Sequence, residues 1–389
     1  MILVAGGGIG GLAAALALAR VGHDVEVLER GATFTTAGAG IQLGPNAVKI
    51  LRTLGVAEAV AQRASAPASL AVYKGATGRC LTRMPLGQAI ADRCGAPYWT
   101  LHRADLLSAL ADAVADSAAI KVTFGCELVS VSAQGDTVSA TCADGKVRTG
   151  AALICADGVW SRVRSTVAPG FRPAHSGYCA YRTLLPIARA GDMETNVVGA
   201  WLSPNAHVIH YPVQAGTALN IVVIISNSWN APGWDAHAEA AELEAATARR
   251  FASPLRAAIV AAEAWHKWSL PHPVVLPTWN AGPVALLGDA AHAMLPFFAQ
   301  GAAMALEDAT ALAAAVASSA TDLPSAFARY HATRNARVAR VQQASIANGR
   351  IFHLSGPAAF ARDAVMTMVP GSALLSRYDW LYAGDGMCD

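Results

Sequence analysis

Three glycines and a glutamate near the start of the chain have the spacing of a dinucleotide-binding site. Gly6, Gly8 and Gly11 form the pattern G-x-G-x-x-G after a short apolar run, and Glu29 follows at the end of a second such run. The first glycine allows a tight turn, the second lets a pyrophosphate approach the backbone, and the third lets a helix pack closely. That helix offers free N–H groups to phosphates, and Glu29 can accept hydrogen bonds from a ribose. An ordinary glycine-rich turn is the alternative, but glycines, strands and carboxylate in register favour dinucleotide binding.

Two aspartates each follow a buried apolar run and lie beside a glycine. Asp157 stands between Ala156 and Gly158 after the run 151–155, and Asp289 follows Gly288 after the run 284–287. A carboxylate in such a place can accept hydrogen bonds from a sugar-like hydroxyl close to the backbone. For Asp289 taken alone, a helix N-cap is the simpler alternative.

A histidine and a tyrosine share one face of a strand expected at 207–213. Side chains alternate along a strand, so His207, Ile209 and Tyr211 point to one side and His210 to the other. The two polar side chains could hold opposite ends of a substituted ring, with Ile209 as an apolar floor. From these residues alone, a core histidine and a strand tyrosine are the simpler interpretation.

These groups need an α/β framework to position them. A strand at 2–5, a helix at 12–20 and a strand at 25–28 form one βαβ unit, whereas strands dominate from 171 to 226. We therefore predict an α/β fold in which a Rossmann-like nucleotide-binding domain carries an inserted β-sheet substrate domain and C-terminal helices. The expected bounds are 1–72, 98–170 and 268–352 for the first domain, 73–97 and 171–267 for the second, and 353–389 for a helical tail.

Composition excludes several classes of protein. The 389 residues carry 29 basic and 27 acidic side chains, and no basic block indicates nucleic acid or a membrane surface. The seven cysteines are scattered without C-x-x-C, which predicts neither a disulfide framework nor a zinc site, and no metal is expected. No apolar run approaches the ~20 residues of a membrane-spanning helix. The strand expected at Ile2 leaves no room for a signal peptide, so we expect a cytoplasmic protein with reduced cysteines.

The last long helix, expected at about 323–351, carries four arginines at 329, 334, 337 and 340. We expect this series to form a solvated face. No G-x-S-x-G, H-E-x-x-H or Walker A pattern occurs, so the sequence gives no support to a hydrolase or a nucleotide triphosphatase.

Three separated motifs together resemble one family, the single-component FAD-dependent aromatic hydroxylases. They are the glycine motif with Glu29, the stretch 156–162 (ADGVWSR), and the stretch 287–296 (LGDAAHAMLP), which continues to Gln300-Gly301 and Glu307-Asp308. They occur in the family's order over residues 1 to about 352. One departure is Ala293, where many members have His-Pro. The absence of a second G-x-G-x-x-G fits a family whose nicotinamide cofactor binds transiently.

The resemblance implies non-covalent FAD, with NADH or NADPH as co-substrate. It implies that reduced flavin and O₂ form a hydroperoxide beside Pro296, from which one oxygen passes to the ring of a small aromatic substrate. The protein is then a monomer or homodimer without a nucleic acid or membrane partner. The residues that the resemblance assigns to the cofactor are Gly6, Gly8, Gly11, Glu29, Arg30, Gln42, Arg103, Asp157, Gly288, Asp289 and Gly301.

For the substrate, the His-x-x-x-Tyr spacing resembles that of hydroxylases acting on hydroxylated benzoates and nicotinates. There the histidine handles the phenolic proton and the tyrosine helps to hold the ring, which implies these roles for His207 and Tyr211. The sequence looks closest to 3-hydroxybenzoate 6-hydroxylases. It is also similar to salicylate hydroxylases and to 6-hydroxynicotinate 3-monooxygenases, although the latter have a histidine in place of Gln42. Gln300 is the expected partner of a ring substituent, and Arg182 either anchors a carboxylate or makes a structural ion pair.

Overall fold

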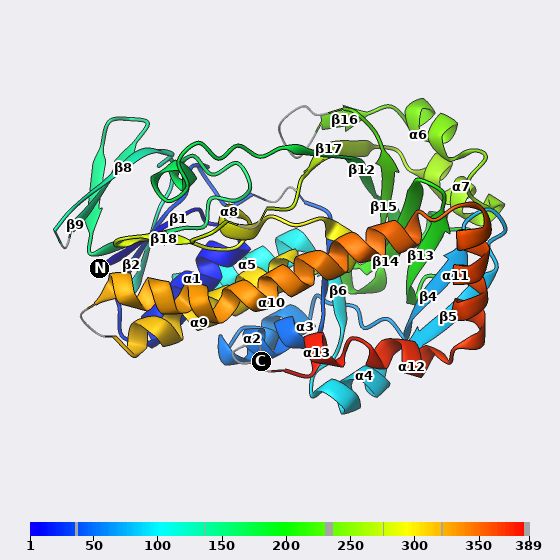
Figure 1. The fold of residues 1–389 in the computed structure, drawn as a ribbon, viewed down its shortest axis with the longest axis horizontal. Helices are drawn as coiled ribbons and strands as arrows, with labels where there is room; N and C mark the ends of the chain where they lie inside the picture. Colours follow the sequence, from blue (N-terminus) through cyan, green and yellow to red (C-terminus); the bar gives the residue numbers. More distant parts are fainter. Residues whose placement is uncertain (36–37, 136, 230–235, 275, 320–321, 385–389) are drawn as a thin grey trace.

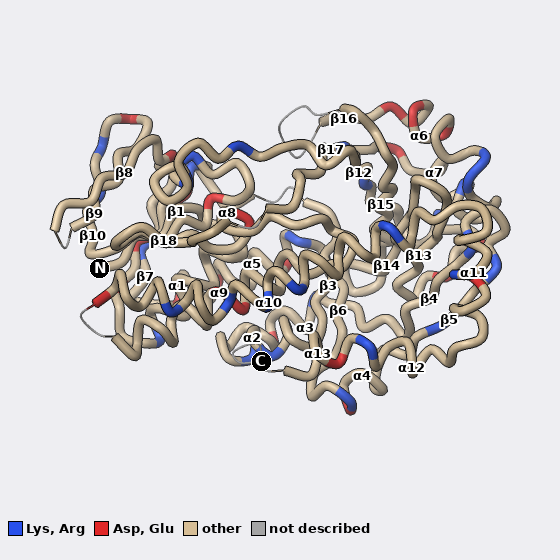
Figure 2. The backbone as a smooth tube through the Cα atoms, viewed as in Figure 1, with Lys and Arg blue, Asp and Glu red and all other residues tan. Residues whose placement is uncertain are grey.

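The computed structural model describes the chain except residues 36–37, 136, 230–235, 275, 320–321 and 385–389. Two main sheets lie side by side along its longest dimension, and one helix of 30 residues, α10 (Leu323–Phe352), runs past both (Figure 1). In Figure 2, acidic residues gather around α6 (Ala240–Thr247) and basic residues lie near α7 (Ser253–Ala261) and α11 (Gly356–Met368). Of the helices in the described ranges, none has both the length and the apolar character needed to cross a bilayer.

The first sheet has six strands and forms the nucleotide-binding framework. Its spatial order is β18 (Asn280–Ala281), β19 (Val284–Leu286), β11 (Ala152–Cys155), β1 (Ile2–Ala5), β2 (Val25–Leu28) and β7 (Ile120–Thr123). All pairs are parallel except β18 with β19. Its central strands are apolar and fully buried because helices cover the sheet, as parallel sheets require. The helices around it include α1 (Ile9–Arg20), α5 (Arg103–Ala115), α8 (Asp289–His292) and α9 (Gly301–Ala317).

The second sheet has eight strands, contributed by two separate stretches of chain. Its order is β16 (Ala236–Ala238), β17 (Trp265–Pro271), β12 (His175–Pro186), β15 (Ala218–Ser226), β14 (Ala206–Val213), β13 (Val197–Ser203), β4 (Ser69–Lys74) and β5 (Cys80–Pro85). One face packs with α6 and α7 around Trp201, Tyr181 and Trp265. The opposite face is turned toward the nucleotide-binding framework, because its side chains pack with Leu295 and Phe297.

Smaller elements join the two sheets. β3 (Gly40–Leu43) pairs with β6 (Trp99–His102), and β8 (Leu128–Gln134), β9 (Thr137–Cys142) and β10 (Val147–Gly150) form a three-stranded sheet. The remaining helices are α2 (Pro45–Thr53), α3 (Ala57–Ala61), α4 (Gly87–Cys94), α12 (Gly371–Ser376) and α13 (Asp379–Tyr382), with 3-10 turns η1 (Val163–Thr166), η2 (Ile187–Arg189), η3 (Gln214–Gly216) and η4 (Pro296–Phe298).

The predicted α/β class, with a Rossmann-like domain, a further β-sheet and C-terminal helices, is confirmed. The expected boundaries at residues 73 and 267 fall inside β4 and β17, so the division into domains at those positions stays a prediction. The expectation of fully reduced cysteines is wrong, because the structure joins Cys126 to Cys142 by a disulfide. The antiparallel pairing of β8 with β9 brings these two cysteines together, which their sequence spacing does not reveal.

Candidate active site

Close approaches of backbone explain two of the three glycines of the N-terminal motif, and the third leaves open space. Gly6 has a φ of +100°, and a Cβ there would lie 2.7 Å from the carbonyl oxygen of Ala156. A Cβ on Gly11 would lie 1.9 Å from the carbonyl oxygen of Gly6, so a larger residue would push α1 away from β1. A Cβ on Gly8, which precedes α1, would meet nothing within 4 Å. The N-terminus of α1 is therefore open to a ligand, and an N-terminus of this kind attracts phosphate.

Glu29 is fixed beside this turn. Its carboxylate oxygens accept hydrogen bonds from the backbone N–H groups of Gly7 and Gly31, each at 2.7 Å. The neighbouring Arg30 is exposed. The carboxylate is thus held rigidly at the end of β2, in the place where such motifs bind a ribose.

The two aspartates lie in protein-lined recesses. Asp157 accepts a hydrogen bond from the backbone N–H of Arg162 at 3.2 Å, whereas its Oδ1 is buried without a partner among the described residues. Burial raises the pKa of Asp157, and it also raises the pKa of Asp289 against the opposing effects of His292 and Arg103. Gly288 occupies the N-cap of α8 with no side-chain capping bond, so the structure does not place Asp289 as the cap. Both carboxylates are available to a hydroxyl-bearing ligand.

Arg164 joins the two aspartate motifs, and no sequence pattern distinguishes it from the exposed Arg162. Arg164 is 4% exposed. It donates to the carbonyl oxygens of Ala290 at 2.6 Å, Asp289 at 3.0 Å and Gly158 at 3.2 Å. Because it contacts loops that lie far apart in the sequence, Arg164 fixes how β11 and β19 present their carboxyl ends.

Arg103, the first residue of α5, lies in the same region. Its side chain is accessible to solvent, yet the surrounding protein desolvates it and lowers its pKa, while Asp289 raises the pKa and Arg182 lowers it. A Cβ on Gly38 would lie 3.2 Å from the Cβ of Arg103, so the segment just before β3 packs against this arginine.

A cavity of about 430 Å³ opens between this segment and the second sheet. Its lining includes Gly38 and Ala39 from the framework and Arg182, Asn220 and His266 from the sheet. Arg182 stacks over the ring of Trp268, with its guanidinium carbon 4.7 Å from the ring centroid. The cavity therefore brings a cation and an amide to the boundary between the two sheets.

The sheet face toward the framework carries His207 and Tyr211, as the strand alternation predicted. His207 is 1% exposed and lies 5.2 Å from the ring of Phe297, whereas His210 accepts a hydrogen bond from Trp201 in the core on the opposite face. Between the two predicted residues, Ile209 is only partly buried. Its register partner on β15, Val222, is also partly buried. The middle of this sheet face is therefore partly exposed, with His207 and Tyr211 on either side.

Gln42 and Tyr98 lie at the Tyr211 end of this part of the sheet face. The hydroxyl of Tyr98 donates to Oε1 of Gln42 at 2.7 Å. Burial raises the pKa of Tyr211, and a hydrogen bond with Gln42 opposes that rise. Gln42 thus contacts the predicted substrate tyrosine.

The Pro296 loop lies over the His207 end. Pro296 begins the turn η4, and Phe297 within that turn packs edge-on against both His207 and Tyr178. The next element, α9, begins at Gly301, where a Cβ would meet nothing within 4 Å. Phe297 was not predicted from the sequence, because an aromatic residue in a loop gives no signal of its distant partner.

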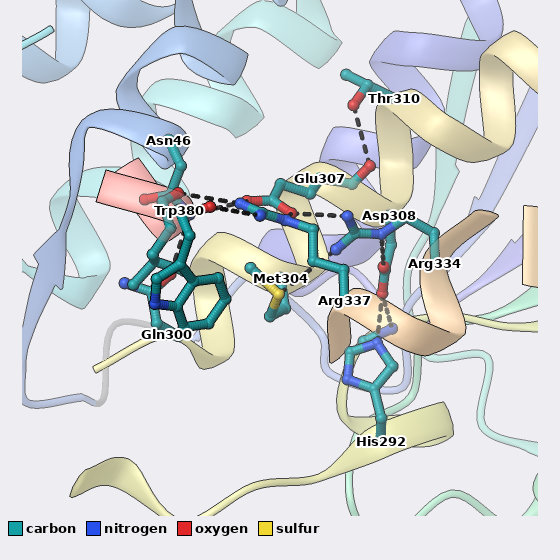
Figure 3. A network of polar contacts seen from close by, with 12 residues as sticks. Asn46, His292, Gln300, Met304, Glu307, Asp308, Thr310, Arg334, Arg337 and Trp380 are labelled. Carbon is teal, nitrogen blue, oxygen red and sulfur yellow. Dashed lines mark hydrogen bonds and ion pairs between the residues drawn. The ribbon is translucent and has the colours of Figure 1, made fainter. Parts of the chain in front are cut away.

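Gln300 points into a buried polar network (Figure 3). Its Oε1 accepts a hydrogen bond from Nδ2 of Asn46 at 3.0 Å, and the same nitrogen donates to Glu307 at 2.8 Å. Glu307 also accepts from Arg337 and Arg334, each at 2.7 Å. The predicted contact of Gln300 with a substrate stays a prediction.

The expectation that the arginine series forms a solvated face is wrong for Arg334 and Arg337, which are 1% and 8% exposed. Arg334 binds Asp308 as well as Glu307, and Asp308 also contacts Nε2 of His292 and accepts from the N–H of Gly288 (Figure 3). Burial alone would raise the pKa of Asp308, but His292 and Arg334 lower it. The network therefore holds in place the N-terminus of α8, where Asp289 lies.

Comparison with known proteins agrees with this geometry. A family model for the FAD binding domain matches residues 1–345, and the chain belongs to this family of FAD-binding proteins. A 3-hydroxybenzoate 6-hydroxylase of Aquipseudomonas alcaligenes is 36% identical over 385 residues, which cover 98% of this chain and 97% of that protein. A 6-hydroxynicotinate 3-monooxygenase of Pseudomonas fluorescens is 35% identical over 350 residues, covering 88% and 90%.

Among solved structures, a salicylate hydroxylase substrate complex superposes with a TM-score of 0.83 at 27% identity, covering 99% of this chain and 95% of that one. These matches confirm the predicted family and fold. Within the described ranges, no cluster of three or more histidine, cysteine or acidic side chains is arranged to hold a metal ion.

Proposed function

We propose that the protein is an FAD-dependent monooxygenase that uses NADH or NADPH and O₂ to hydroxylate a small aromatic carboxylate with a ring hydroxyl, such as 3-hydroxybenzoate. Its relatives named for 3-hydroxybenzoate and 6-hydroxynicotinate hydroxylation support this class of substrate. A hydroxypyridine carboxylate and salicylate, with loss of its carboxyl group, are the alternative substrates. The proposal includes a cytoplasmic location and a monomeric or homodimeric state.

One observation carries this proposal. Ile209 and Val222 leave the sheet face partly exposed between His207 at one end and Tyr211 at the other. An apolar floor between two polar side chains suits a planar ring with polar substituents. Phe297, in the turn that begins at Pro296, covers the His207 end.

The residues on the framework side fit FAD. The open N-terminus of α1 and the fixed carboxylate of Glu29 suit the diphosphate and ribose of the adenine half. The unpartnered Oδ1 of Asp157 and the carboxylate of Asp289 suit the hydroxyls of the cofactor, and Arg103 suits its phosphates. When bound and reduced, FAD would supply the electrons that activate O₂, and the protein's residues prepare the substrate.

The protein's own task is to increase the electron density of the ring. A phenol has a pKa near 10, so little phenolate exists at neutral pH without a base. His207 is neutral, because burial lowers its pKa well below the usual 6.5, so one ring nitrogen has a lone pair that can receive the phenolic proton. The same lowered pKa means that this proton must be passed on rather than kept. Tyr211 would hold the ring and Arg182 its carboxylate, while the bound ring and Phe297 would exclude water.

The test is the amount of hydroxylated product formed per NAD(P)H oxidised, with H₂O₂ measured alongside across a pH series. His207→Ala should retain FAD, form less product, release more H₂O₂ and recover partly as pH rises. Tyr211→Phe should chiefly weaken substrate binding. If His207→Ala hydroxylates as fast and with as little H₂O₂ as the parent, the histidine is a core residue.

A flavin dehydrogenase or oxidase is the second candidate. Incubation with NAD(P)H, O₂ and a panel of hydroxybenzoates and hydroxypyridine carboxylates separates the two. A product heavier by one oxygen supports hydroxylation, whereas coenzyme oxidation without such a product supports the second candidate.

A further inference from the structure

A second histidine lies directly against His207. Nδ1 of His207 is 2.8 Å from Nε2 of His353, a hydrogen-bond distance, and the two ring centroids are 5.0 Å apart. His353 immediately follows α10 and caps it, because its backbone N–H bonds to the carbonyls of Gly349 and Ile351. The rings of Phe297 and Phe352 pack edge-on against His207. The pair is therefore held in a mostly apolar enclosure.

This contact determines which nitrogen of His207 can act as a base. A neutral imidazole has one N–H and one lone pair, so one ring of the pair must donate to the other. Nε2 of His207 is buried and has no hydrogen-bond partner among the described residues. If Nδ1 of His207 donates to His353, that Nε2 carries the lone pair and is ready to receive a proton.

Neither ring is suited to keep that proton. Burial lowers the pKa of His207 well below 6.5, and the neighbouring His353 lowers it further. The pKa of His353 is about 4, because of burial and then of Arg250 and Arg362. His353 is nevertheless partly exposed, whereas His207 is 1% exposed. A proton accepted at His207 can thus reach solvent only by moving outward.

The charged groups around His353 disfavour a proton that stays on its ring and so favour release of that proton to solvent. Arg362 donates to the carbonyls of Ile351 and Phe352 and pairs with Asp363 at 2.8 Å. Asp363 also pairs with Lys74 at 3.4 Å, so its charge is shared between two cations. Together with Arg250, these groups leave the surroundings of His353 net positive, which opposes an imidazolium there.

We propose that His353 is a positioning residue that holds His207 in its basic tautomer and conducts the substrate's proton to solvent. This rests on the proposed role of His207 as the base. The O–H bond of the phenol breaks and its proton binds Nε2 of His207. The proton on Nδ1 of His207 passes to Nε2 of His353, and the proton on Nδ1 of His353 passes to water. Both rings end neutral with exchanged tautomers, and reverse transfer restores them when the product oxygen is reprotonated.

The test follows ionisation of 3-hydroxybenzoate on binding to the FAD-loaded enzyme without NAD(P)H. Stopped-flow absorbance reports phenolate formation, and a pH-indicator dye reports the released proton. His353→Phe keeps an aromatic ring but removes both nitrogens, and it should slow phenolate formation and proton release about 100-fold or more, the lower end of the range for proton-transfer catalysis. His353→Gln keeps an acceptor for His207 but cannot conduct a proton, so it should bind the ligand normally and release the proton slowly.

Tyr178→Phe is the matched control, because Tyr178 packs against the ring of His353 and the change removes only a hydroxyl. It should ionise the ligand at the parent rate. Parent-like rates in both His353 variants would overturn the proposal, and if His353→Phe lost its FAD the Gln variant alone would decide. His207→Ala distinguishes a failure of the proposed base from a failure of the proposed role of His353. If it too ionises the ligand normally, the proposed base is wrong, whereas a loss in His207→Ala alone overturns only the role of His353.

Discussion

The buried carboxylate of Glu307 should be indispensable for stability. It is fully buried and accepts hydrogen bonds from Asn46 at 2.8 Å, Arg334 at 2.7 Å and Arg337 at 2.7 and 3.0 Å. Two carboxylates, those of Glu307 and Asp308, balance these two arginines. Glu307→Ala leaves one uncompensated positive charge in the interior, and breaking a buried ion pair in this way costs about 3–5 kcal/mol. That is a large part of the 5–15 kcal/mol by which proteins are usually stable.

Urea unfolding with saturating FAD, followed by both circular dichroism and tryptophan fluorescence, measures this loss. Agreement of the two probes checks that unfolding is a single transition. Arg337 also donates to the carbonyls of Trp380 and Leu381, so hydrogen exchange in residues 371–384 should accelerate in Glu307→Ala.

The double variant Glu307→Gln/Arg337→Met serves as the control, because it removes one charge of each sign and keeps the volume. It should be more stable than the sum of its single variants predicts, by roughly 0.5–3 kcal/mol. A loss below about 1 kcal/mol in Glu307→Ala, or strict additivity in the double variant, would refute the argument from buried charge.

Three further results are expected. Gly11→Val should abolish FAD retention, since its Cβ would lie 1.9 Å from the carbonyl oxygen of Gly6; full flavin content in the purified variant would contradict this. Asp289→Ala should weaken FAD binding by about 1–3 kcal/mol with the fold intact, as flavin titration would show, and unchanged affinity would exclude a bond to the cofactor. Burial lowers the pKa of His210 from 6.5 to about 4. As the pH falls, His210 is therefore protonated in the unfolded chain before it is protonated in the folded protein. The free energy of unfolding is highest above pH 6.5 and decreases as the pH falls toward 4. By pH 5 the loss is about 2 kcal/mol, and His210→Gln should flatten this pH dependence of urea unfolding.

The sequence predicts best where structure depends on neighbours along the chain. The βαβ unit of residues 2–28 is found as expected, because apolar runs, glycines and helix formers there all act locally. The alternation along β14 likewise separates His207 from His210. Such patterns predict which face of a strand or helix a residue occupies. They do not predict which other residues pack against that face.

The predictions that were wrong or missed concern residues whose contacts are far away in the sequence. Arg334 and Arg337 have the spacing of an exposed face, and only the packing of α10 against α9 shows that they meet Glu307 and Asp308. Cys126 and Cys142 are joined through a hairpin register that scattered spacing does not indicate. His353 ends a helix without any motif, and it becomes notable only because β14 places His207 beside it.

The strand order of the first sheet has a consequence for how the chain is synthesised. β19, at residues 284–286, pairs with β11, and β11 pairs with β1 at the N-terminus. Asp289, at the start of α8, and Arg334 of α10, which binds Asp308, follow still later in the sequence. At the usual 5–20 residues per second, the ribosome completes β1 roughly 15–60 seconds before it adds β19. During that interval the whole second sheet emerges while one edge of β11 has no partner strand, so the proposed contact of Asp289 with FAD can form only in a nearly finished chain.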